Sequence, residues 1–86
     1  MDDIAEIAGK LSEAQRALVL ASEPGGWGRD DTAVGVDLVG ARYWNTARAL
    51  ERKVLGDIEE QPDFYPSGLY FNNQLGLAVR AHLNGE

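Results

Sequence analysis

Apolar residues recur at helical spacing in several stretches of the chain. The first stretch covers residues 1–11, where the apolar positions follow two aspartates that suit a helix N-terminus. These positions are Ile4, Ile7, Ala8 and Leu11. Gly9 weakens a helix here. Residues 1–11 are therefore predicted to be either an N-terminal arm or an extra helix.

The second helical stretch begins at a capping signal. Ser12 and Gln15 fit the S-x-x-Q capping box, in which each side chain accepts a hydrogen bond from the other residue's backbone N–H. The sequence predicts a helix over residues 13–22. The face expected to be buried consists of Ala14, Ala17, Leu18 and Ala21.

A loop and a short extended segment come next. Residues 22–31, SEPGGWGRDD, combine proline with several glycines and are predicted to form a loop. Over residues 32–39 apolar and β-branched residues alternate around Gly35 and Asp37, which favours a short strand. A degenerate second helix over residues 32–39 is the competing interpretation.

The clearest helical pattern runs from residue 41 to residue 55. Gly40 precedes it, and Gly56 follows in the position of a left-handed C-cap. At about 100° per residue, one stripe is expected to face the core, namely Tyr43, Ala47, Leu50 and Val54. The opposite, solvent side carries Arg42, Asn45, Arg48, Ala49 and Arg52, with Trp44 on the border.

The C-terminal third predicts a hairpin and a last helix. Residues 57–61 and 69–71 flank a loop rich in proline and glycine, and Ile58, Leu69 and Phe71 are expected to point inward. Asn72 or Asn73 then caps a helix. The apolar side of that helix is expected to consist of Leu75, Ala78, Val79, His82 and Leu83.

Length and composition narrow the class of protein. The chain has 86 residues, of which 44% are hydrophobic and 26% charged, which predicts one folded domain over residues 1–86. No apolar run approaches the roughly 20 residues that span a bilayer, so a cytoplasmic protein with no membrane partner is expected. The absence of cysteine excludes disulfides and thiolate chemistry.

Charge is distributed unevenly. The net charge is −6, yet residues 42–53 contain three arginines and Lys53 against Glu51, a local charge of +3 that leaves −9 for the other residues. Between Lys53 and Arg80 there is no lysine or arginine. The expected hairpin instead carries Asp57, Glu59, Glu60 and Asp63.

Several segments resemble small bacterial and prophage winged helix-turn-helix proteins. Residues 46–55, TARALERKVL, are similar to the end of that family's recognition helix, and residues 69–80 to its second wing strand entering the closing helix. Residues 11–15 are similar to the start of its first helix, so the resemblance covers residues 11–84. It implies an α+β, winged-helix-like fold: N-terminal helices, a short strand, an amphipathic recognition-type helix, a β-hairpin wing and a C-terminal helix.

The resemblance implies a non-enzymatic regulator of transcription that binds duplex DNA, with a homodimer through the terminal helices as a further expectation. A helix over residues 41–55 in a major groove could contact bases and phosphates. The residues placed to do so are Arg42, Asn45, Arg48 and Arg52, with Trp44 and Lys53 beside them. The same composition is also typical of an ordinary solvated helix face and of a protein-binding hot spot.

The acidic hairpin favours a different partner. Docking it on DNA would bring carboxylates toward phosphates, and family members usually have a basic wing and a clear second helix. The alternative function is an inhibitor of a host nucleic-acid-binding complex, of anti-CRISPR or DNA-mimic type, which binds a basic protein. Its binding surface would be Asp57, Glu59, Glu60 and Asp63.

No catalytic constellation is present in the sequence. His82 is the single histidine and has no nucleophile or orienting partner that a motif identifies. Residues 57–63 alternate as calcium ligands do, but the glycine and the bidentate glutamate of an EF-hand are missing. Neither an enzyme activity nor a metal or cofactor is expected.

Overall fold

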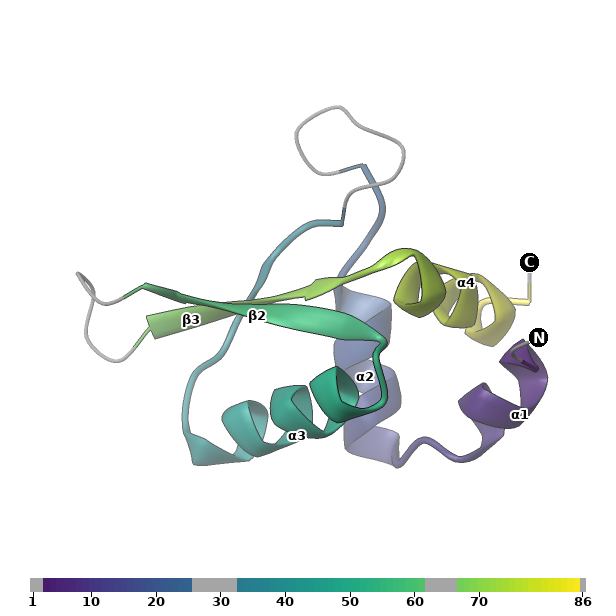
Figure 1. The fold of residues 1–86 in the computed structure, drawn as a ribbon, viewed down its shortest axis with the longest axis horizontal. Coiled ribbons are helices and arrows are strands. Elements are labelled where there is room, and N and C mark those ends of the chain that lie inside the picture. Colours follow the sequence, from purple (N-terminus) through teal and green to yellow (C-terminus); the bar gives the residue numbers. More distant parts are fainter. Residues whose placement is uncertain (1–2, 26–32, 62–66, 86) are drawn as a thin grey trace.

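The computed structural model describes residues 3–25, 33–61 and 67–85 (Figure 1). In chain order the elements are α1 (Ile4–Gly9), α2 (Glu13–Ala21), β1 (Val36–Asp37), α3 (Ala41–Arg52), β2 (Gly56–Gln61), β3 (Ser67–Asn72) and α4 (Gln74–Leu83). The strands form a three-stranded antiparallel sheet in the order β1-β3-β2. The predicted α+β class, β-hairpin and C-terminal helix are confirmed.

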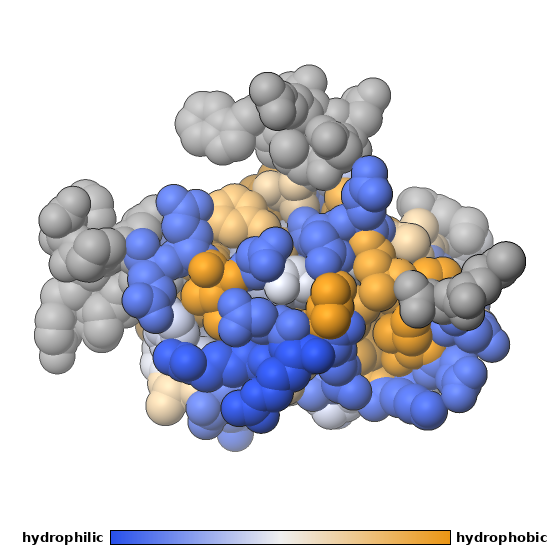
Figure 2. Space-filling view, in the orientation of Figure 1, coloured by the Kyte–Doolittle hydropathy of each residue, from blue (hydrophilic) through white to orange (hydrophobic). Residues whose placement is uncertain are grey.

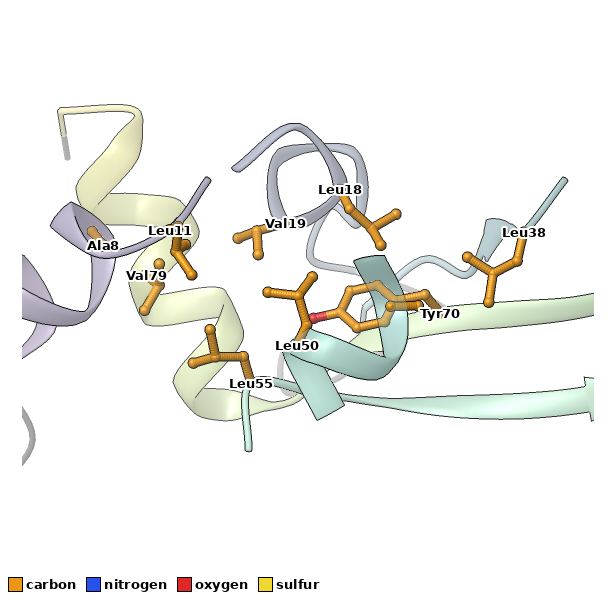
Figure 3. Packing of buried hydrophobic residues seen from close by; sticks show 10 residues of the cluster. Ala8, Leu11, Leu18, Val19, Leu38, Leu50, Leu55, Tyr70 and Val79 are labelled. Atoms are coloured by element: carbon orange, nitrogen blue, oxygen red, sulfur yellow. The ribbon is translucent and has the colours of Figure 1, made fainter. Parts of the chain in front are cut away.

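Helices cover one side of the sheet and one end of it. Figure 1 shows α2 and α3 on the same side of the β2-β3 hairpin, and α4 continuing from the end of β3 to lie against α1. The core forms where α2, α3, α4 and β3 meet, and Figure 3 shows Leu50 of α3 beside the Tyr70 ring of β3. Its completely buried members include Val19, Ala47, Leu50, Leu55, Tyr70 and Val79.

Both N-terminal helices begin at side-chain caps. The Asp3 carboxylate accepts a hydrogen bond from the N–H of Glu6 at 3.2 Å, so the extra-helix interpretation of residues 1–11 holds. Ser12 Oγ accepts from the N–H of Gln15 at 3.1 Å, and Gln15 Oε1 accepts from the N–H of Ser12 at 2.9 Å. The predicted capping box is confirmed.

The face of α2 predicted to be buried is largely wrong. Leu18 is buried, but Ala14, Ala17 and Ala21 are exposed. The core lies about one residue further round the helix, on the side that carries Leu18 and Val19 and continues to the C-cap Ser22. The pattern counted alanine methyls as equal to leucine and valine, whereas burying the larger side chains removes more apolar surface from water.

The predicted stripe of α3 is half right. Ala47 and Leu50 are fully buried, whereas Tyr43 is 51% and Val54 66% exposed. Val54 lies beyond the last helical residue, Arg52, so the helical phase does not extend to it. Trp44, expected on the border, packs in place of Tyr43: a Cβ on Gly68 of β3 would collide with its ring.

Val54, and not Gly56, has the left-handed conformation at the end of α3. Its φ is 61°, and the N–H groups of Val54 and Leu55 donate to the carbonyls of Glu51 (3.0 Å) and Leu50 (3.1 Å), which is a Schellman motif. A β-branched residue is strained there. Gly56 instead begins β2, where a Cβ would collide with the Tyr70 hydroxyl.

The hairpin points Tyr70 into the core and not Leu69 or Phe71. Ile58 pairs with Tyr70 across the two strands, so these two side chains share the inner face. Leu69 and Phe71 alternate with Tyr70 and lie on the opposite face, where both remain partly buried. The expected inward set combined residues from two faces, and only Ile58 of the three packs against the core.

A buried hydrogen-bond network joins α2 to β3. The Tyr70 hydroxyl donates to Asn72 Oδ1 (2.8 Å), and Asn72 Nδ2 donates to the carbonyls of Val19 (2.8 Å) and Ser22 (2.9 Å). Ser22 Oγ accepts from the N–H of Asn72 (3.0 Å) and donates to the Val34 carbonyl (2.8 Å). Burial, with a smaller contribution from Asp57, raises the pKa of Tyr70 far above its usual range, so its hydroxyl stays a donor.

Asn73, the second of the two candidate caps, begins α4. Its Oδ1 accepts from the N–H of Gly76 at 2.9 Å. The expected apolar side of α4 is correct for Val79, which is buried, and for Leu75 and Leu83, which pack against the core, but Ala78 and His82 are exposed. Gly76 is buried instead. At this point α4 packs so closely on the backbone at Leu55 that a Cβ on Gly76 would collide with the Leu55 carbonyl.

None of residues 33–39 is helical and Val36–Asp37 form a short strand, which favours the strand interpretation over the second helix. Ala33 forms an isolated antiparallel bridge with Pro24, and β1 pairs with β3. Thr32 and most of the predicted loop lie outside the described residues. Since only Leu38, Val39 and Gly40 separate β1 from α3, no helix directly precedes α3.

Candidate nucleic-acid interface

The side of α3 that faces away from the sheet is basic. Because Ala47 and Leu50 pack inward, the residues on the opposite side of the helix face solvent. Figure 2 shows hydrophilic residues gathered over α3. The basic face is defined here as Arg42, Asn45, Arg48 and Arg52, together with Lys53 at the end of the helix, and all five residues are exposed.

The charges of the basic face are not neutralised by any described carboxylate at salt-bridge distance. The two salt bridges within the described residues are Lys10 with Glu6 (3.1 Å) and Arg80 with Glu23 (3.8 Å), and neither involves α3. Within residues 3–25, 33–61 and 67–85, no carboxylate therefore competes with an anionic ligand for these cations.

Arg48 is held against Trp44. Its guanidinium carbon lies 5.5 Å from the centroid of the Trp44 ring, a cation–π geometry worth about 0.5–1 kcal/mol at an exposed site. Trp44 is itself partly buried against β3 at Gly68. The sequence placed Trp44 among the contact residues, but its position makes it a platform that orients Arg48.

The acidic residues that the sequence grouped as one surface lie on two faces of the hairpin. Asp57 and Glu59 pair with Phe71 and Leu69 and share their face, away from α3. Glu60 alternates with them and points to the other side of β2. All three are exposed, and Asp63 lies outside the described residues.

An apolar groove, which sequence reasoning missed, runs between α2, β1 and α3. It has a volume of about 540 Å³, and its apolar lining includes Ala14, Ala17, Ala21, Val36, Val39 and Tyr43. Four of these residues had been assigned to buried helix faces. The available signal was the small size of the three alanines, because small side chains cannot fill the space between two helices.

The described part of the chain has neither a cluster of metal-ligating side chains nor a helix that could span a membrane. Within residues 3–25, 33–61 and 67–85, no three histidine, aspartate or glutamate side chains gather as a metal site would require. His82 is exposed at the end of α4. None of the described helices is long and apolar enough to cross a membrane.

Comparison with known proteins gives no match: no protein-family model, no curated protein and no solved structure is similar to this chain.

Proposed function

We propose that this chain is a non-enzymatic, winged-helix-type protein that binds duplex DNA through the basic face of α3. The observation that carries the proposal is the exposure of Arg42, Asn45, Arg48 and Arg52 on one side of a helix whose other side is anchored in the core. Arginine pairs with guanine edges and phosphates, and asparagine with adenine.

The surroundings of α3 support this proposal. The helix is followed directly by the β2-β3 hairpin, and β1 precedes it, so the sheet holds it from behind. This is the order of a winged-helix domain with one departure, since β1 stands where a helix-turn-helix has its first helix. We infer that α3 is positioned for a groove by Trp44, Ala47 and Leu50 packing on the sheet and α2.

The separation of Asp57 and Glu59 from α3 weakens the main objection to DNA binding. Asp57 and Glu59 lie on the sheet face away from α3, so the thickness of the sheet and a helix of about 10 Å diameter separates them from the basic face. The Debye length is about 8 Å at physiological ionic strength. Phosphates on α3 are therefore largely screened from these carboxylates, although Glu51 and Glu60 remain on the helix side.

The number of cations sets the expected salt dependence. Three or four phosphate contacts give a slope of log K against log salt of about −3, so affinity should fall about 40- to 150-fold between 50 and 200 mM salt. A homodimer, which we also propose, would place two basic faces on one site and steepen that slope.

The proposal is tested by fluorescence anisotropy of a mixed pool of labelled duplexes. We expect micromolar binding at low salt, lost at least tenfold in Arg48→Ala/Arg52→Ala. The matched control is Lys10→Gln/Arg16→Gln, which removes two positive charges from exposed positions outside α3. Binding that weakens equally in both variants, or no binding at low salt, would refute the proposal.

A further inference from the structure

A second surface lies on the outer face of the sheet, defined as the face turned away from α2 and α3. Leu69 on the central strand pairs with Asp37 of β1 on one side and with Glu59 of β2 on the other. In the next row, Phe71 pairs with Asp57. Two apolar side chains therefore run along the middle of this face, with the carboxylates of β2 on one flank and, beside Leu69 on the other, Asp37 at the rim of the groove between α2 and α3.

The apolar middle of the outer face is continuous, since a Cβ on Gly35 would lie near both Leu69 and Phe71. The Phe71 ring lies across Gly35, where a Cβ would be 2.8 Å from its Cζ atom. Leu69 and Phe71 are partly exposed, and Figure 1 shows α2 and α3 on the other side of the hairpin. This arrangement leaves apolar area that a ligand with long aliphatic stems, such as an arginine side chain, could cover.

The charge on the outer face is of one sign among the described residues. Directly paired side chains are about 5 Å apart and two strand spacings are about 10 Å, so Asp37, Asp57 and Glu59 lie within mutual electrostatic range. No described lysine or arginine lies on these strands. Mutual repulsion between these carboxylates would be relieved by a cationic partner.

The free strand edge indicates the shape of that partner. β2 is the edge strand of the described sheet, and its residues 56–61 are paired with β3 only. An open edge accepts an added strand through its backbone groups. The carboxylates of β2 repel a second β2 of the same charge and attract a basic segment, which selects against self-pairing.

We infer that the outer face and the β2 edge bind an extended, arginine-rich or lysine-rich segment of a partner protein. The segment lies beside β2 as an additional strand. Cations at alternate positions of the segment meet Asp57 and Glu59, which lie between the added strand and the apolar pair Leu69 and Phe71. This surface is separate from the basic face of α3 and does not depend on DNA binding.

The test uses a fluorescein-labelled ten-residue peptide of alternating arginine and threonine, titrated with the full chain. The outer-face variant is Asp57→Asn/Glu59→Gln. The matched control is Glu51→Gln/Glu60→Gln, which removes the same charge from two exposed positions, one on α3 and one on the other face of β2. We expect peptide binding to weaken about tenfold in the outer-face variant and less than twofold in the control.

Backbone amide shifts from NMR give a second readout, and we expect the largest changes along residues 57–60 on peptide addition. Equal weakening in both variants would mean attraction by net charge alone and would overturn the inference, as would no binding. Concentration-dependent self-association that the outer-face variant abolishes would also overturn it, because the occupant would then be a second copy. DNA affinity of the outer-face variant should be unchanged or higher, so failure here and failure of the α3 proposal are distinguishable.

Discussion

Replacing Asn72 with alanine removes the centre of the buried network between α2 and β3. The carboxamide accepts from the Tyr70 hydroxyl and donates to the carbonyls of Val19 and Ser22. Its loss leaves a hydroxyl and two carbonyls without these partners in a site where Asn72 is 4% exposed. Each buried unpaired group costs about 1–3 kcal/mol.

The expected loss is large relative to the stability of a domain of this size. Allowing for relaxation and for water entering the site, we expect Asn72→Ala to lower the free energy of unfolding by about 3–5 kcal/mol. A domain of 86 residues has about 4–13 kcal/mol in total. The variant should therefore lose a substantial part of that stability, and all of it if the total lies at the lower end of the range.

The adjacent asparagine supplies the control. Asn73→Ala removes the α4 cap and the hydrogen bond from Asn73 Nδ2 to the Val54 carbonyl (2.8 Å), both in more exposed surroundings. We expect a loss of about 1 kcal/mol. Urea unfolding followed by circular dichroism measures both variants. If Asn72→Ala is no less stable than Asn73→Ala, the buried network does not carry the stability assigned to it.

Further predictions concern backbone strain, close packing and proton binding. Val54→Gly should raise the free energy of unfolding by about 0.5–1 kcal/mol, since it relieves a left-handed valine that is mostly exposed; destabilisation in urea would contradict the strain. Gly76→Ala should lower the melting temperature, because its Cβ would collide with the Leu55 carbonyl. Gly9→Ala has open space around it and should raise the melting temperature slightly. Equal effects of the two substitutions would argue against the close packing of α4. Because the pKa of Tyr70 is raised in the folded state, the folded state keeps a proton that the unfolded chain releases above about pH 10. The free energy of unfolding should therefore fall above about pH 10 by up to about 1.4 kcal/mol per pH unit. Tyr70→Phe should lack this part of the decline, and a Tyr70→Phe profile identical to that of the parent chain would refute the prediction.

Local signals were predictable from sequence because they involve residues a few positions apart. The Ser12 capping box, the helix after Gly40 and the hairpin all belong to this class. The basic face of α3 was also predictable, because helical periodicity alone places Arg42, Arg48 and Arg52 on one side.

Features that depend on register or on distant partners were not predictable. Tyr70, Leu69 and Phe71 are all apolar enough for a core, and a shift of one residue exchanges the faces of the strand. Asn72 resembled a helix cap, while its partner Val19 is 53 positions away. The separation of Asp57 and Glu59 from the basic face likewise follows from strand register.

The most direct test of the α3 proposal is an NMR titration of the isotope-labelled chain with a duplex, following backbone amides and arginine Nε–Hε signals. We expect the largest changes at Arg42, Asn45, Arg48 and Arg52, with little change at Asp57 and Glu59. Changes confined to the outer face of the sheet, or no changes at low salt, would contradict DNA binding through α3.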